Sequence, residues 1–153
     1  MILSFIEVKN LTHIFRENDE KKTEKIALDN INLKIDKGEF IAIIGVNGSG
    51  KSTLAKHFNG LLLPSEGECI VDGMKVDDSE DIWKVRQKVS MVFQNPDNQI
   101  IATVVEDDIA FGPENMGLER EKIKDRIEFA LKSLHIEHLR KCHRICYQVG
   151  KNN

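Results

Sequence analysis

The chain has 153 residues, of which 41% are hydrophobic and 31% are charged, and its formal net charge is -3 at pH 7. This length and composition fit one globular domain with a hydrophobic core, and the negative charge provides no basic surface for nucleic acid. The longest apolar runs, residues 40–44 and 61–63, are far shorter than the roughly 20 residues of a membrane span. The first residues lack the basic start and cleavage site of a signal peptide. The sequence therefore predicts a cytoplasmic protein with no nucleic-acid partner.

Two β segments are expected at the start of the chain, over residues 2–8 and 27–35. In the second segment isoleucine and leucine alternate with asparagine and lysine, which is typical of a strand with one buried face. Residues 16–25 lie between the two segments and contain eight charged side chains. We therefore expect a hairpin whose connection is a solvated loop.

The pattern G-x-x-x-x-G-K-S, which defines a P-loop, runs from Gly45 to Ser52. It follows the apolar run at residues 40–44, expected to be a buried strand, and precedes a helix expected to reach Leu61. Its glycines can adopt positive φ angles that turn successive backbone N–H groups toward an anion. In such a loop Lys51 reaches the β and γ phosphates of a nucleotide and the Ser52 hydroxyl ligates Mg²⁺, at the positive end of the helix dipole. The predicted phosphate site consists of Gly45, Val46, Asn47, Gly48, Ser49, Gly50, Lys51, Ser52 and Thr53. The alternative is a strand, turn and helix that matches the pattern by chance.

The residues after this helix predict a hairpin and a short helix. Asn59-Gly60 should end the preceding helix, and Asp72-Gly73 should form a tight turn between strands at residues 68–71 and 74–76. Ser79 is a candidate N-cap for a helix that runs to about Gln87.

A second buried strand is expected at residues 89–93, followed by a polar loop at residues 94–99. Thr103 and Glu106 have the spacing of a capping box, which predicts a helix from there to about Ala110, ended by Gly112-Pro113. A stripe of apolar residues predicts a further helix over residues 120–134.

Three cysteines indicate a reducing compartment rather than a disulfide framework. Cys142 and Cys146 lie near three histidines in the sequence, which raises a zinc site as an alternative, although this spacing lacks a second well-spaced ligand pair. The nearby histidines are His135, His138 and His143.

Three stretches besides the P-loop carry a resemblance to a known family. They are Ala-Leu-Asp-Asn-Ile-Asn-Leu from residue 27, Val-Phe-Gln-Asn-Pro-Asp-Asn-Gln from residue 92, and Val-Glu-Asp-Asp-Ile-Ala-Phe-Gly-Pro-Glu-Asn from residue 105. Up to Leu139 the chain resembles the nucleotide-binding subunit of ABC transporters, and within it the energy-coupling factor (ECF) ATPases of cobalt-type and vitamin importers. The resemblance implies an α/β P-loop NTPase core with an N-terminal antiparallel β subdomain. It also implies ATP and Mg²⁺ as ligands and an ATPase that drives uptake of a vitamin or a metal ion.

The resemblance assigns roles to further residues. Phe15 stands where the family has an aromatic residue that stacks on adenine; the alternative is a strand phenylalanine in the core. Gln94 corresponds to a glutamine that ligates Mg²⁺ and senses the membrane partner; the alternative is a residue that caps a turn. Residues 69–72 superficially resemble a Walker B strand, but their length and the following Gly73 favour the hairpin.

The resemblance also implies partners. These are a second ABC ATPase subunit, identical or different, a transmembrane coupling protein that docks at residues 95–99, and a membrane protein that binds the transported substrate. The expected location is then the cytoplasmic face of the cell membrane. A surface loop without a partner is the alternative for residues 95–99.

The chain departs from the family pattern after residue 140. It contains no L-S-G-G-Q signature, Walker B strand or switch histidine, so no catalytic residue for hydrolysis is assigned. We interpret residues 1–140 as the N-terminal part of an ATP-binding domain that is truncated before the signature and Walker B segments. Residues 141–153 are interpreted as an aberrant tail, because freely chosen codons for residues 143–153 can encode Leu-Ser-Gly-Gly in a shifted frame.

Two functional classes stay open at this point, and a third is more distant. The first is a transporter ATPase, and the second is a nucleotide-binding remnant without turnover. The third, a P-loop kinase for small molecules, is disfavoured by residues 94–99. Loss of covering elements is expected to expose residues 41–44 and 89–93, which read as strands of the parallel type.

Overall fold

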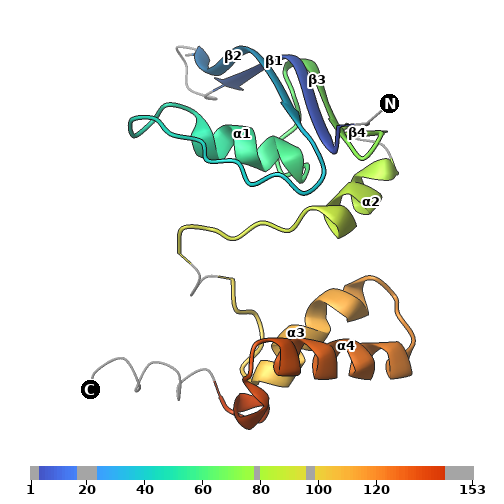
Figure 1. Ribbon diagram of the computed structural model, residues 1–153. Helices are drawn as coiled ribbons and strands as arrows, with labels where there is room; N and C mark the ends of the chain where they lie inside the picture. The colour runs from blue at the N-terminus through green and yellow to red at the C-terminus, as the bar shows by residue number, and fades with distance from the viewer. Residues whose placement is uncertain (1–3, 17–23, 78–79, 96–98, 144–153) are drawn as a thin grey trace. The chain divides into compact units, whose positions relative to one another are not determined.

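The computed structural model of the chain describes residues 4–16, 24–77, 80–95 and 99–143. It contains two compact units, Met1–Met91 and Val92–Asn153, each described here by itself (Figure 1). No helix in the described ranges is long and apolar enough to span a membrane.

A four-stranded antiparallel sheet dominates the first unit, with the strand order β2-β1-β3-β4 (Figure 1). The predicted N-terminal hairpin is confirmed, because β1 pairs with β2 along its length. β1 is much longer than the predicted segment. Irregular register near Asn10, which has φ 48°, interrupts the alternation of apolar residues, so the sequence pattern predicted only the first part of the strand. The strands are β1 (Ile6–Arg16), β2 (Glu24–Ile35), β3 (Glu66–Val71) and β4 (Met74–Lys75).

Helix α1 (Lys51–Phe58) packs beneath this sheet in Figure 1. Leu54 and Phe58 of the helix join buried residues of the sheet in one core. Asn59 and Gly60 end the helix as their sequence predicts, so the expectation that the helix reaches Leu61 is wrong. The sheet residues of this core are Ile6, Val8, Leu11, Leu28, Cys69 and Val71. The core therefore fixes α1, and with it the end of the P-loop, against β1, β2 and β3.

The β3–β4 hairpin is confirmed, and so is its turn. Asp72 has φ 48° and Gly73 has φ 78°, the pair of positive angles that a two-residue hairpin requires. The Asp72 carboxylate forms an ion pair with Lys88. Asp72 thus lies in a hairpin turn, which agrees with the prediction that residues 69–72 are not a Walker B strand.

The expected buried strands at residues 40–44 and 89–93 are wrong as assignments. Both segments lack strand structure, and the Phe40 and Ile44 side chains are 97% and 92% exposed. A strand exists only where a neighbour accepts and donates its backbone hydrogen bonds, and no strand among the described residues pairs with either segment. The expectation that residues 41–44 are exposed in this chain agrees with the structure.

Helix α2 (Asp81–Lys88) confirms the short helix predicted after the hairpin. Its N-cap is Glu80, which makes no side-chain capping hydrogen bond, whereas the predicted cap, Ser79, lies outside the described residues. Val85 is fully buried and anchors the helix to the core of the first unit.

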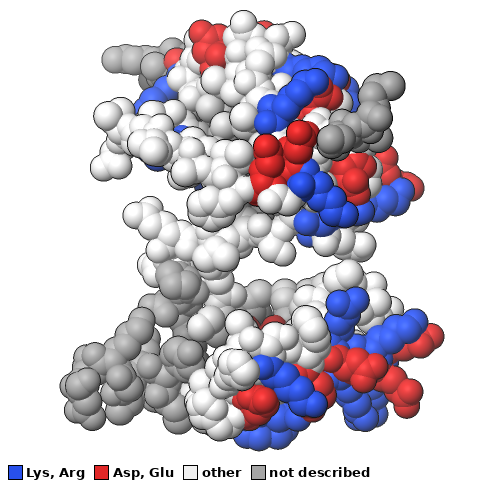
Figure 2. Space-filling model, viewed as in Figure 1, with Lys and Arg blue, Asp and Glu red and all other residues white. Residues whose placement is uncertain are grey.

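The second unit is built from α3 (Val105–Asn115), α4 (Arg120–Ser133) and the short 3₁₀ helix η2 (Glu137–Leu139) (Figure 1). The prediction of α4 is confirmed, and its apolar stripe packs against α3 through Ala110, Ile127 and Leu131. Figure 2 shows charged side chains of both signs beside uncharged residues on the visible face of this unit. Arg140 joins Glu106 of α3 and Glu128 of α4, at 2.7 and 2.5 Å.

Two expectations for α3 are wrong. The helix has Val104 as its N-cap, without a side-chain hydrogen bond, and Glu106 pairs with Arg140 instead of completing a capping box. Gly112 and Pro113 lie inside the helix, because the Met116 N–H donates to the Gly112 carbonyl at 3.1 Å and carries the helix past them. The zinc alternative also lacks support: no group of three or more metal-ligating side chains occurs in the described ranges, and Cys146 lies outside them.

Candidate phosphate-binding site

The predicted P-loop forms a tight turn that leads directly into α1. The Ser49 N–H donates to the Val46 carbonyl at 3.2 Å, and Gly48 and Gly50 have φ angles of 80° and 86°. Gly50 is the N-cap of α1, and its carbonyl accepts the Leu54 N–H at 2.8 Å. The helix therefore begins immediately after a left-handed glycine.

Gly50 is required at its position for two reasons. Its φ of 86° lies in the region that residues with a Cβ rarely adopt. A Cβ there would also lie 2.6 Å from the Ala27 carbonyl oxygen and 2.8 Å from Leu28 Cδ2, both in β2. The loop thus approaches β2 more closely than any other residue type permits. At Gly48, by contrast, a Cβ meets no atom within 4 Å.

The N-terminus of α1 is suited to an anion. The backbone N–H groups of the first helical turn, at residues 51–53, have no partner within the helix. No acidic residue lies in this turn, so no carboxylate of the helix competes for them. Together with the positive end of the helix dipole, these N–H groups favour a bound phosphate.

Lys51 places its positive charge over the loop. Its Nζ donates to the carbonyl oxygens of Gly45 and Val46, at 2.9 and 2.8 Å, and lies 3.4 Å from Ser49 Oγ. These partners are neutral oxygens, and no carboxylate is among them. A phosphate oxygen, which carries charge, is a stronger acceptor than these neutral groups.

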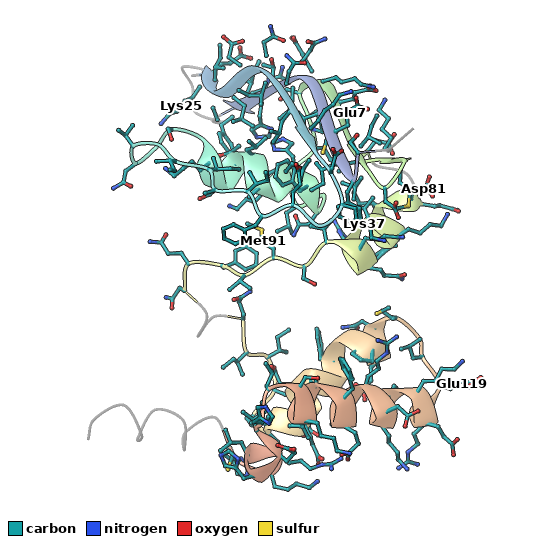
Figure 3. All side chains as sticks on the ribbon, in the orientation of Figure 1. Glu7, Lys25, Lys37, Asp81, Met91 and Glu119 are labelled. Carbon is teal, nitrogen blue, oxygen red and sulfur yellow. The ribbon has the colours of Figure 1, made fainter. Side chains whose placement is uncertain are left out.

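A cleft of about 280 Å³ connects the P-loop with the end of the β1–β2 hairpin. Phe15 and Lys25 are paired across β1 and β2, so the hairpin brings both to this cleft (Figure 3 labels Lys25). Phe15 is 40% exposed and is not one of the buried core residues, while its contact with adenine stays a prediction. The cleft is lined by Phe15, Lys25, Ile26, Ala27 and residues 48–53. Sequence reasoning missed the contribution of Lys25, Ile26 and Ala27, because only the strand register reveals it.

Gln94, the other predicted ligand of Mg²⁺, belongs to the second unit, whereas Ser52 belongs to the first. A joint Mg²⁺ site therefore stays a prediction. Gln94 is exposed and lines a largely apolar cavity of about 600 Å³ with Phe93, Asn95, Gln99 and Ile101. The Phe93 N–H donates to Gln99 Oε1 at 3.3 Å, which closes the ends of the loop. Residues 96–98 of the predicted partner loop lie outside the described residues.

Residues 28–149 match the ABC transporter family model. The ECF transporter ATP-binding protein EcfA1 of Clostridium novyi is 51% identical over 138 residues, which cover 90% of this chain and 49% of that protein. EcfA1 of Clostridium perfringens is 52% identical over 124 residues, which cover 81% and 44%. The chain thus spans about half the length of these curated relatives.

Solved structures give the same picture of the fold. The structure of cbiO1 from Clostridium perfringens, described as part of the ABC transporter complex cbiONQ, has a TM-score of 0.75 and 40% identity, covering 94% of this chain and 55% of that one. The ATP-binding cassette MJ0796, a dimer bound to ADP and Pi, has a TM-score of 0.73 and 30% identity, covering 91% and 61%.

Proposed function

Since this chain belongs to the ABC transporter family, we propose that it is the N-terminal part of the ATP-binding subunit of an ECF-type importer. In this proposal the complete subunit couples ATP binding and hydrolysis to the uptake of a vitamin or a metal ion. The EcfA1 proteins and cbiO1, to which the chain is similar, support the ECF assignment. In this proposal residues 1–140 belong to the ATP-binding domain. The match to the family model continues to residue 149, so the interpretation of residues 141–153 as a tail stays a hypothesis.

The cleft between Phe15 and the start of α1 supports nucleotide binding, and it is the observation that carries the proposal. One end is lined by the Phe15 ring, an aromatic group of the kind that contacts a base. The other end offers the N–H groups of residues 51–53 and the Lys51 ammonium to phosphates. An apolar ring and a cationic loop at opposite ends of one cleft fit a nucleotide better than free phosphate.

Binding exchanges the partners of Lys51. The ammonium leaves the carbonyls of Gly45 and Val46 and binds the terminal phosphates, while Gly48 and Gly50 keep the loop open toward the anion. Ser52 and Gln94 are neutral oxygen donors, which Mg²⁺ accepts together with phosphate oxygens and water. Bound Mg²⁺ supplies charge neutralisation of the phosphates.

Hydrolysis is assigned to the assembled transporter rather than to this chain alone. In this proposal the residues of this chain hold the nucleotide, but none of its carboxylates is assigned to activate water. The partner ATPase, identical or different, supplies a composite site in this proposal, and the dimeric MJ0796 cassette supports such pairing. The second candidate is a nucleotide-binding remnant without turnover, and ATPase activity of this chain, measured alone and beside a full-length relative, distinguishes the two.

The proposed partners include two membrane proteins, a coupling protein and a substrate-binding protein. The apolar cavity beside Gln94 supports residues 94–99 as the docking surface for the coupling protein, because its lining suits an apolar helix. That cbiO1 is part of the ABC transporter complex cbiONQ supports the assembly. The chain then lies at the cytoplasmic face of the membrane, held there by its partners.

Calorimetric titration with Mg-ATP tests the nucleotide site. Replacing Lys51→Ala should raise Kd about 10- to 150-fold, because a charge-assisted hydrogen bond contributes roughly 1.5–3 kcal/mol. Lys56→Ala is the matched control: this lysine lies on the same helix but does not line the cleft, so its Kd should match that of wild type. Equal affinity of wild type and Lys51→Ala would contradict the proposal.

A further inference from the structure

Two buried histidines form a pair between α1, the helix that follows the P-loop, and strand β1. His57 of α1 is fully buried and His13 of β1 is 8% exposed. His57 Nδ1 lies 2.7 Å from the Thr53 carbonyl oxygen, and His57 Nε2 lies 3.1 Å from His13 Nδ1. His13 Nδ1 also lies 3.2 Å from the Leu63 carbonyl oxygen. Every one of these ring nitrogens therefore has a partner.

These contacts fix the protons of the pair. A carbonyl oxygen only accepts, so His57 Nδ1 carries a hydrogen and donates it to Thr53. In the neutral ring His57 Nε2 is then an acceptor, and the His13 Nδ1–H supplies the hydrogen that it shares with Leu63. With both rings neutral, all three contacts are satisfied. If His57 Nε2 gains a proton, that N–H faces the N–H of His13, and the two donors repel each other. Otherwise His13 Nδ1 must lose its hydrogen to become an acceptor, and its hydrogen bond to the Leu63 carbonyl is lost.

The surroundings of His57 disfavour its protonated form. Burial lowers its pKa below the usual 6.5, and the neighbouring His13 lowers it further, against the opposing effect of the Thr53 and Leu63 carbonyls. Cys69 of β3 is an ionisable residue in the hydrophobic core, and burial raises its pKa to about 12, so it stays neutral.

No carboxylate of the packed elements compensates a charge on His57. On β2, Leu28 faces the core while Asp29 is exposed, and on β3 the Glu68 carboxylate pairs with Lys9. The charged groups on α1 itself are cationic, namely Lys51 and Lys56.

The pair also connects the two ends of the nucleotide cleft. The His13 ring contacts the Phe15 ring edge-on, with centroids 4.6 Å apart, and contacts the His57 ring in the same way at 4.8 Å. His57 in turn holds the carbonyl of Thr53, which lines the cleft in the first turn of α1. A continuous line of contacts therefore runs from the proposed base end of the cleft to its phosphate end.

We propose that His13 and His57 are positioning residues of the nucleotide cleft, which keep Phe15 and the first turn of α1 in place for a nucleotide only while the His57 ring is neutral. This inference rests on the proposed function. Protonation of His57 breaks a hydrogen bond between β1 and α1 and loosens both ends of the cleft together. Nucleotide affinity thus falls as His57 gains a proton, and a bound nucleotide disfavours that proton to the same extent.

Nuclear magnetic resonance of the imidazole nitrogens in the 153-residue chain tests the inference, with Mg-ATP as the probe. At pH 7.5 both rings should be Nδ1–H tautomers. Saturating Mg-ATP should lower the pKa of His57 by about one pH unit, which corresponds to a tenfold preference of the nucleotide for the neutral pair. An unchanged pKa with Mg-ATP bound, or an Nε2–H tautomer at His57, would overturn the inference.

Two variants separate positioning from simple stability. His57→Asn keeps a donor near the Thr53 carbonyl but does not titrate. Between pH 7.5 and pH 5, the fall in Mg-ATP affinity should therefore be several-fold smaller in this variant than in wild type. Comparison with the variant cancels the titration of the phosphate itself, whose second pKa is about 6. His138→Asn, at an exposed histidine outside the first unit, should keep the wild-type profile.

The outcomes also distinguish this inference from the function on which it rests. If wild type and Lys51→Ala bind Mg-ATP equally at pH 7.5, the proposed function fails and the inference fails with it. If wild type binds specifically and His57 does not respond, only the inference fails. Should His57→Asn not fold, the titration of the wild-type rings still decides.

Discussion

Replacing two glycines of the P-loop one at a time separates backbone strain from close packing. Gly48 and Gly50 have similar φ angles, 80° and 86°, so an alanine at either position should cost roughly 1–2 kcal/mol in left-handed strain. At Gly50 the new Cβ also meets the Ala27 carbonyl oxygen at 2.6 Å, and overpacking of this kind typically costs about 1–3 kcal/mol more. Since that oxygen belongs to the backbone of β2, it cannot rotate away.

Urea denaturation and Mg-ATP titration of both variants measure the difference. We expect the free energy of unfolding to fall by about 2–5 kcal/mol in Gly50→Ala and by no more than about 2 kcal/mol in Gly48→Ala. Gly50→Ala should also bind Mg-ATP more weakly than Gly48→Ala, because it pushes the start of α1 away from β2. Equal stability of the two variants would refute the close approach of the loop to β2.

Two further predictions concern buried ionisable side chains of the first unit. Because burial lowers the pKa of His57 below 6.5, the unfolded chain binds more protons than the folded chain just below that pH. The contribution of neutral His57 to the free energy of unfolding should be fully present above pH 6.5. It should decline as the pH falls, by up to about 1.4 kcal/mol per pH unit. Urea midpoints from pH 8 to pH 5 should therefore drop less in His57→Asn than in wild type, and parallel curves would contradict this account. Cys69 is fully buried with a pKa of about 12, so a thiol reagent at pH 8 should modify it only after urea is added, whereas Cys142 should react in the folded chain. Peptide mapping by mass spectrometry measures the modification of each cysteine. Rapid modification of Cys69 without urea would contradict its burial.

The P-loop was predictable from sequence because all of its geometry is local. The glycines, Lys51 and the first turn of α1 lie within one short stretch, and their spacing sets their positions. Phe15 was placed by resemblance alone. Its neighbour Lys25 and the His13–His57 pair were not found, since β-strand register and packing, rather than any local pattern, bring these residues together.

Two kinds of tertiary effect overrode the sequence signals. Gly112-Pro113 is a strong local signal for the end of a helix, yet α3 continues through it while Ile109 and Ala110 pack against α4. A proline in that position removes only one hydrogen bond of the helix, that to the Ile109 carbonyl. The run at residues 40–44 has the composition of a buried parallel strand, but composition does not supply the neighbouring strands on which such a strand depends.

The exposure of that run leads to a prediction in which two apolar residues near the P-loop behave in opposite ways. Phe40 is 97% exposed, so Phe40→Ser should change the free energy of unfolding of this chain by no more than about 0.5 kcal/mol. Leu54, buried in the core beneath the sheet, is the control, and Leu54→Ala should cost about 2–5 kcal/mol. Binding of the dye ANS, which reports exposed apolar surface, should decrease in Phe40→Ser. The segment leads straight into Gly45 and pairs with no strand in the described part of the chain, whereas α1 and β2 hold the other side of the P-loop. A loss of 2 kcal/mol or more in Phe40→Ser would show that the segment is packed in this chain and that both sides of the loop are held.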